Sequence, residues 1–148
     1  MSSVMETAKG MTMHAAEMLC KDAAWIPDDK KDWNPKENAK SVNQILSECA
    51  RGNFRIAAAV KGATPGEISD PADFVGLKNH VIDSAKEFCS AIDSLDESGL
   101  EKEIMAPWGQ PMSLSALIFL PASHMTYHDG QVNYIQLLLG DTKFHWRE

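Results

Sequence analysis

Basic residues are scarce in this 148-residue sequence. It has 14 lysines and arginines against 21 aspartates and glutamates, which gives a formal net charge of -7. A chain with this charge lacks the broad positive field that attracts nucleic acid or anionic lipid. We therefore expect no nucleic acid and no membrane surface among its partners.

Cysteines are also few. Cys20, Cys49 and Cys89 are odd in number and far apart, and no two of them have the CxxC spacing. Such a set does not build the disulfide framework of a small secreted domain. Residues 1–6 lack the basic stretch and the apolar run of a signal peptide. These features predict a reducing, cytoplasmic location.

Long hydrophobic runs are missing as well. No apolar segment reaches about 18 uninterrupted residues, so we expect no membrane span. The sequence does contain 44% hydrophobic residues, and in four segments they recur at steps of three and four. This spacing predicts amphipathic helices. A chain of this length can form one domain, over residues 1–148, with its own core.

The first three segments predict helices of about 20 residues. The first extends from about Val4 to Trp25. The second begins after Ser41, whose spacing to Gln44 predicts a capping box. The third has Asp70 as its predicted N-cap, because a proline at the first helical position follows it.

The fourth segment begins after Ser113 and ends at Gly140, with Pro121 inside it. A proline removes one backbone hydrogen bond and clashes with the carbonyl four residues earlier, so we expect a kink near Leu117. Four such helices predict an all-α four-helix bundle. The connections 26–40 and 96–112 are long enough to allow crossovers.

The predicted buried face of the fourth helix carries three polar residues, His124, His128 and Gln131. An unpartnered buried imidazole or amide costs about 1–3 kcal/mol, so each should have a partner. Two histidines four residues apart share one face of a helix and can bind one metal ion. A histidine pair bonded to hydroxyls, water or Gln131 explains the same spacing without a metal.

The spacing of these histidines is that of an HExxH peptidase helix, but one essential residue differs. In that motif a glutamate follows the first histidine and acts as the general base. Here Met125 follows His124. A zincin peptidase mechanism therefore has no proton acceptor at that position.

The order of motifs resembles that of the DinB/YfiT-like superfamily, which consists of metal-binding four-helix bundles. Three motifs within residues 27–140 carry the resemblance: Trp33-Asn34-Pro35, Pro107-Trp108-Gly109 and His124-x-x-x-His128-x-Gly130-Gln131. The last motif is the specific one. The resemblance implies a four-helix bundle with a metal site.

The resemblance also implies a set of ligands, which in that superfamily is usually three histidines. Two of them correspond to His124 and His128, but the third corresponds to Glu48 on the second helix. A set of two histidines and one glutamate is competent for Zn²⁺, Ni²⁺, Fe²⁺ or Mn²⁺. Alternatively, the loss of the third imidazole leaves the site empty or vestigial. Cys49 is a weaker candidate, because it lies about 100° around the helix from Glu48.

The functions that the resemblance implies fall into two classes. Some members are transferases or isomerases that use bacillithiol, mycothiol or glutathione, and others are DNA-damage-induced proteins without an assigned reaction. The first class predicts a divalent-metal-dependent thiol transferase or hydrolase that acts on a small molecule. The second predicts a non-catalytic stress-response bundle whose metal site is structural or vestigial.

The C-terminal tail carries aromatic residues that could form a contact with a second subunit. Residues 142–148 include two large aromatic residues, Phe144 and Trp146. We expect them to pack on the bundle or on a second subunit, and symmetric dimers are the commonest assembly. A homodimer is therefore predicted.

Overall fold

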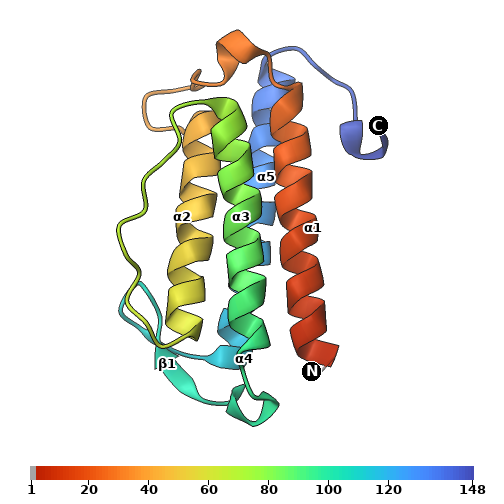
Figure 1. Cartoon of the computed structure of the whole chain (residues 1–148). Helices are drawn as coiled ribbons and strands as arrows, with labels where there is room; N and C mark the ends of the chain where they lie inside the picture. Colours follow the sequence, from red (N-terminus) through yellow and green to blue (C-terminus); the bar gives the residue numbers. More distant parts are fainter. Residues whose placement is uncertain (1–2) are drawn as a thin grey trace.

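The computed structural model describes residues 3–148 and shows four long helices side by side (Figure 1). They are α1 (Ser3–Trp25), α2 (Val42–Val60), α3 (Phe74–Asp93) and α5 (Leu120–Leu138). Around the bundle, α1 contacts α3 and α5, and α2 contacts the same two helices. Helices α1 and α5 run in one direction, and α2 and α3 run in the other. The predicted all-α four-helix bundle is confirmed.

Two further predictions concerned a membrane span and a signal peptide. Among residues 3–148, no helix has both the length and the hydrophobicity that a membrane crossing requires. Residues 1 and 2, on which the signal-peptide prediction partly rests, lie outside the described part of the chain.

Shorter elements complete the chain. They are the helix α4 (Leu114–Leu117), the strands β1 (Glu103–Met105) and β2 (Pro111–Ser113), and the 3₁₀ turns η1 (Asp28–Lys30), η2 (Glu97–Gly99) and η3 (His145–Arg147). The two strands pair antiparallel, with Ile104 opposite Met112. Gly109 has a φ of 83° in the turn between them, a conformation that glycine adopts without strain. The sequence predicted only a loop here.

The connection between α1 and α2 is held by a buried lysine. Lys31 donates a hydrogen bond from Nζ to the carbonyl of Ala23 at 2.7 Å, and its ammonium lies 3.7 Å from the ring centre of Phe74. Burial lowers the pKa of Lys31 to about 8. The carbonyl of Lys31 accepts a hydrogen bond from Asn43 N. The connection is therefore fixed at both ends, which brings Lys40 to the start of α2.

The helix starts were predicted with mixed success. The capping box of α2 is present, with Ser41 Oγ 3.2 Å from Gln44 N and Gln44 Oε1 2.8 Å from Ser41 N. The N-cap of α3 is Asp73, which accepts from Gly76 N at 2.7 Å, so the prediction of Asp70 was wrong. Asp70 is not available as a cap because its carboxylate binds Arg51.

The connection between α2 and α3 forms the crossover of the bundle. Helix α2 ends where α3 ends, so residues 61–73 must cross the whole length of the bundle in an extended conformation (Figure 1). Thirteen extended residues span about 43 Å, more than the roughly 28 Å length of α2. The long connections 26–40 and 96–112 were the predicted places for a crossover, but both join helices at the same end of the bundle.

Pro121 produces a break rather than the predicted kink. Helix α4 ends at Leu117, and α5 begins at Leu120 with the proline in its first turn. Proline is favoured there because its missing N–H has no intrahelical partner in any case. The predicted start of the fourth helix at Ser113 is confirmed to within one residue, because Ser113 is the N-cap of α4 and its side chain accepts from Ala116 N.

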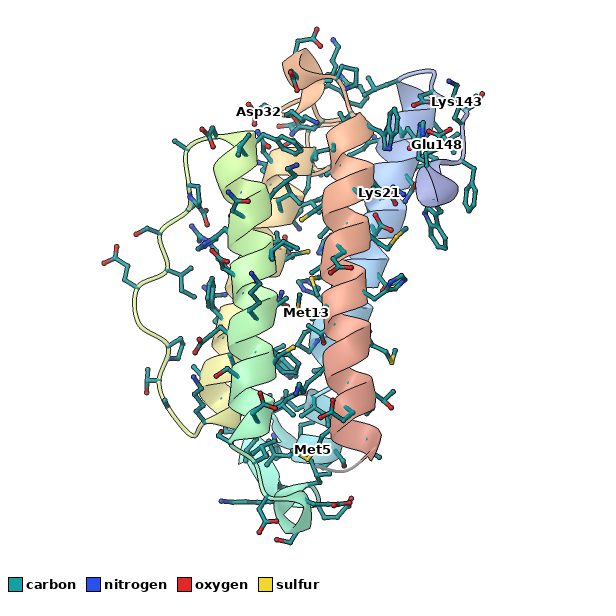
Figure 2. The ribbon with its side chains drawn as sticks, turned by 45° about the vertical axis from the view of Figure 1, so that its right-hand side comes forward. Met5, Met13, Lys21, Asp32, Lys143 and Glu148 are labelled. Carbon is teal, nitrogen blue, oxygen red and sulfur yellow. The ribbon has the colours of Figure 1, made fainter. Side chains whose placement is uncertain are left out.

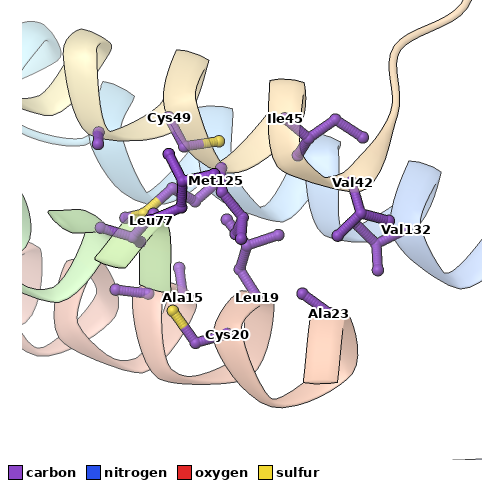
Figure 3. Packing of buried hydrophobic residues seen from close by; sticks show 14 of the residues in the cluster. Ala15, Leu19, Cys20, Ala23, Val42, Ile45, Cys49, Leu77, Met125 and Val132 are labelled. Atoms are coloured by element: carbon purple, nitrogen blue, oxygen red, sulfur yellow. The ribbon is translucent and has the colours of Figure 1, made fainter. Parts of the chain in front are cut away.

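Apolar side chains fill the bundle in two clusters. One lies between α1, α2, α3 and α5 and includes Leu19, Met125 and Val132 (Figure 3). The second lies nearer the β1–β2 hairpin. Among the buried polar residues, Asn53 donates from Nδ2 to Ser84 Oγ at 3.0 Å. A buried polar pair of this kind is tolerated because the hydrogen bond compensates for lost water.

Candidate metal centre

Three side chains from α2 and α5 meet at one point. The Nε2 atoms of His124 and His128 are 3.1 Å apart. Oε1 of Glu48 lies 3.4 Å from Nε2 of His128 and 3.8 Å from Nε2 of His124. The structure therefore brings together the three residues that the sequence predicted as metal ligands.

The spacing of these donors fits a metal ion. Ligand atoms bound about 2.0–2.1 Å from a tetrahedral zinc ion are roughly 3.3–3.4 Å apart. The three distances, 3.1, 3.4 and 3.8 Å, bracket that value. The donors thus have the arrangement of one face of a tetrahedral site, which leaves a fourth position for another ligand.

Gln131 orients one of the histidines. Nδ1 of His128 lies 2.6 Å from Oε1 of Gln131. With that oxygen as the acceptor, His128 carries its proton on Nδ1 and keeps the lone pair of Nε2. The lone pair points to the meeting point with His124 and Glu48. Hydrogen bonds of this type hold metal-binding histidines in position.

Lys40 orients the carboxylate. Its Nζ lies 2.8 Å from Oε2 of Glu48, so Oε1 is the oxygen directed at the histidines. Partial burial raises the pKa of Glu48, but the hydrogen bond from Lys40 and the nearby His128 and His124 lower it by a larger amount. The net result is a pKa below the usual value. Burial and the charge of His128 lower the pKa of His124. An ionised carboxylate and a neutral imidazole are the forms that bind metals.

Cys49 is closer to the histidines than its position on the helix led us to expect. Its Sγ and one ring nitrogen each of His124 and His128 lie within 4.8 Å of one another. The thiol is fully buried, and this burial raises its pKa well above the usual range. A metal must remove that proton before it can bind the sulfur, whereas Glu48 is already ionised.

A glycine allows α2 and α5 to approach at the site. A Cβ atom added at Gly52 would lie 3.3 Å from both Cε1 and Nδ1 of His124. A larger residue would therefore push on the imidazole ring. The sequence prediction missed this role, because a glycine in the middle of a helix has no pattern that distinguishes it.

The site opens into a cavity of about 1650 Å³. Glu48 and His124 belong to its lining, together with the aromatic residues Tyr127 and Trp108. His128 is 3% exposed and closes the inner side. A small molecule in the cavity can therefore reach the point where the three donors meet.

The buried face of α5 matches the predicted one only in part. His128 and Ile135 are buried as predicted, but Met125 and Val132 also face the core. Of the other positions predicted on that face, Leu138 is 47% exposed and the side chain of His124 is 33% exposed. The break before α5 separates its helical phase from that of α4, and the prediction had assumed one continuous helix. As a result, His124 lies at the edge of the core and lines the cavity.

A second polar cluster lies on the α1 side of α5, and the sequence prediction missed it. Asp22 and Asp129 are 0% and 6% exposed. Oδ2 of Asp22 accepts hydrogen bonds from Asn133 Nδ2 at 3.0 Å and from Trp146 Nε1 at 3.2 Å. Burial, the hydrogen bond to Asp22 and its charge raise the pKa of Asp129 to about 8. The raised pKa favours the protonated form of Asp129 at neutral pH.

Comparisons with known proteins identify solved structures that share this fold. No protein-family model and no curated protein matches the sequence. A solved structure of a conserved protein from Enterococcus faecalis is 18% identical, with a TM-score of 0.78 over 95% of this chain and 99% of its own. A DinB-like protein from Bacillus subtilis is 17% identical, with a TM-score of 0.75 over 96% of this chain and 97% of its own.

A third solved structure is a mutant form of the mycothiol-dependent maleylpyruvate isomerase. It is 10% identical, with a TM-score of 0.70 over 89% of this chain and 63% of its own. At these identities the similarity concerns the fold. The chain therefore has the fold of the DinB-like proteins.

Proposed function

We propose that the chain is a DinB-like metalloprotein whose divalent ion is bound by Glu48, His124 and His128. The observation that carries this proposal is the triangle of donor atoms, whose edges are 3.1, 3.4 and 3.8 Å. Gln131 and Lys40 support it, because each directs a lone pair toward the same point. Zn²⁺, Ni²⁺, Fe²⁺ and Mn²⁺ all accept this donor set.

The proposed activity is transfer of a thiol, or hydrolysis, on a small molecule in the cavity. A divalent ion at this site supplies Lewis acidity, which lowers the pKa of a thiol or water bound beside it. The cavity admits a substrate to the same point, and its aromatic walls offer apolar contact. The thiol class is favoured by the shared fold with an isomerase that is described as mycothiol-dependent.

Two measurements test this proposal in sequence. The first is the affinity of the purified protein for the four divalent ions, determined by competition with a chromophoric chelator. We expect Glu48→His to tighten binding, because an imidazole replaces a carboxylate that is shared with Lys40. Unchanged affinity in this variant would remove Glu48 from the ligand set.

The second measurement is turnover. The metal-loaded protein is assayed with bacillithiol, mycothiol and glutathione against small electrophiles, and with ester substrates for hydrolysis. Thiol- and metal-dependent turnover is expected. Metal binding without turnover by any pair would instead favour the alternative of a non-catalytic stress-response bundle with a structural metal.

We further infer that the protein is a cytoplasmic homodimer. The three cysteines are free thiols, which agrees with a reducing compartment. Phe144 and Trp146 of the tail are 65% and 51% exposed, and Trp25 beside them is 44% exposed. Exposed aromatic groups of this kind are common at subunit contacts. Light scattering on the wild type and on Phe144→Ser tests the dimer; a monomeric wild type would contradict it.

A further inference from the structure

The lining of the cavity has a direction along α2. From Glu48, the helix face that borders the cavity continues through Arg51 to Arg55. Seven residues separate Glu48 from Arg55, which amounts to nearly two full turns, so both lie on the same side of the helix. The distance between them along the axis is about 10 Å. A positive charge therefore lies two turns from the proposed metal ligands in the same cavity.

The two arginines differ in their partners. Arg51 binds Asp70 through two hydrogen bonds, at 3.0 Å from Nε and 2.6 Å from Nη2. Its guanidinium thus anchors the crossover segment 61–73 against α2. In the described part of the chain, no carboxylate lies within ion-pair distance of Arg55, and its side chain is exposed. Arg55 is therefore available to an anion from solution.

Beside these charges and polar residues such as Ser47 and Asp70, the cavity lining also includes apolar side chains. Ile56 and Leu120 belong to it, and the β1–β2 hairpin contributes Met105 and Trp108. Met105 is 63% exposed and Trp108 is 50% exposed. Large apolar groups at the rim of a cavity are typical of a ligand site rather than of an inert surface.

We infer that the cavity binds an elongated monoanion, whose metal-binding head group lies at Glu48 and His124 and whose carboxylate pairs with Arg55. The apolar body of the ligand lies along α2 against Ile56 and Leu120. This inference rests on the proposed metal site for its head group. The carboxylate half rests on Arg55 alone and can be tested without a metal.

The probe for the complete ligand is 8-mercaptooctanoate, whose extended chain matches the span from Glu48 to Arg55. Its dissociation constant for the zinc-loaded protein is measured by calorimetry beside that of 8-mercapto-1-octanol, which has the same length and no charge. We expect the acid to bind about five- to tenfold more tightly, because a charged hydrogen bond forms at a partly exposed site. 3-Mercaptopropionate, too short to reach both groups, should bind no more tightly than the alcohol.

Variants identify the group responsible. In Arg55→Gln the preference for the acid should disappear. In Lys86→Gln, which removes the same charge from an exposed position on α3 outside the cavity lining, the preference should remain. Equal affinities of the acid and the alcohol in the wild type, or a preference that survives in Arg55→Gln, would overturn the inference.

A metal-free experiment separates this inference from the proposed function. Octanoate carries the carboxylate and the apolar chain but no thiol, and its binding to metal-free protein is followed by amide chemical shifts. Shifts around Arg55 and Trp108 that vanish in Arg55→Gln would support the carboxylate subsite even if no metal binds. Octanoate shifts that are the same in wild type and Arg55→Gln would contradict it.

Discussion

His128 and Asp129 are neighbours on α5, and only 3% and 6% of their surfaces are exposed, yet they face different helices, because consecutive residues lie about 100° apart around the helix. His128 faces α2, where its ring nitrogen meets Glu48 and His124 beside an open cavity. Asp129 faces α1, where it meets Asp22. Trp146 from the tail donates to the same Asp22 carboxylate.

The difference shows two ways to satisfy buried polar groups. On the α2 side, nitrogen and oxygen lone pairs converge, and Gln131 takes up the remaining N–H of His128. Lys40 pairs with Oε2 of Glu48, whereas a cation at the point of convergence would bind Oε1 and the ring nitrogens. On the α1 side, N–H donors from Asn133 and Trp146 reach Oδ2 of Asp22, and a raised pKa favours the protonated form of Asp129. Hydrogen bonds and a proton, rather than converging lone pairs, characterise that cluster.

The largest expected effect is on metal affinity. His128→Ala removes one of the three proposed ligands, and we expect the affinity for Zn²⁺ to fall by more than about 100-fold. Even the loss of a residue that only hydrogen-bonds to a metal ligand typically lowers metal affinity about 10–100-fold. The matched control is His14→Ala, which removes an exposed histidine of α1. Chelator competition measures both. Equal zinc affinities in the two variants would show that His128 is not a ligand, so that its cluster would not differ from the Asp22 cluster in binding a metal.

The second prediction concerns the cluster formed by Asp22 and Asp129. Asp22→Ala removes the acceptor of Trp146 Nε1 and one of the two acceptors of Asn133 Nδ2, and we expect a loss of about 1–3 kcal/mol in the free energy of unfolding. Asp129→Asn should change it by less than about 1 kcal/mol, because an amide N–H replaces the O–H of the protonated Asp129. Urea unfolding measures both. A large loss in Asp129→Asn would mean that the pair holds a cation rather than a proton.

A pair of glycine variants separates stability from metal binding. In Gly130→Ala the added Cβ meets nothing within 4 Å, so the better helix propensity should stabilise the protein by about 0.5–1 kcal/mol. Gly52→Ala receives the same propensity gain but presses on His124 at 3.3 Å. We expect its zinc affinity to fall several-fold while that of Gly130→Ala is unchanged. Equal zinc affinities would show that the imidazole has room to move.

The smallest effect is expected in the tail that covers the Asp22 cluster. His145 is stacked on Trp25 at 3.9 Å, and its hydrogen bonds to Asp141 and then to Glu148 raise its pKa above the usual value. Figure 2 shows Lys143 and Glu148 at the same end of the bundle as Lys21, whose Nζ lies 3.4 Å from the carbonyl of Trp146.

The sign of the pH effect follows from that raised pKa. Docking of the tail has its full stability below the unfolded pKa of about 6.5 and loses it as the pH rises through the higher folded pKa. Hydrogen exchange of residues 141–148, corrected for the intrinsic rate, should therefore show less protection at pH 9 than at pH 6. His145→Gln should abolish this difference. A difference that persists in His145→Gln would assign it to another group.

Much of this arrangement is predictable from local sequence patterns. The four helices and the capping box at Ser41 follow from spacing and from residue type, and all of them are present in the structure. The set of Glu48, His124 and His128 depended on a resemblance in motifs, and the structure brings these side chains within 3.8 Å.

What the sequence could not provide depends on contacts between distant segments. The local sequence predicts Asp70 as an N-cap, but in the structure its carboxylate binds Arg51, 19 residues away, instead of the start of α3. The nearness of Cys49 to the histidines depends on how α2 is rotated against α5. The pairing of Asp22 with Asp129 joins two helices at opposite ends of the chain. Local periodicity contains no information about any of these contacts.

X-ray absorption spectroscopy of the zinc-loaded protein distinguishes Glu48 from Cys49 as the third ligand. We expect a shell of nitrogen and oxygen atoms at about 2.0–2.1 Å, with the multiple-scattering signal of two imidazoles and no sulfur. A sulfur shell at about 2.3 Å that persists in Glu48→Ala and vanishes in Cys49→Ser would contradict it. In that case Cys49, rather than Glu48, would complete the set with His124 and His128.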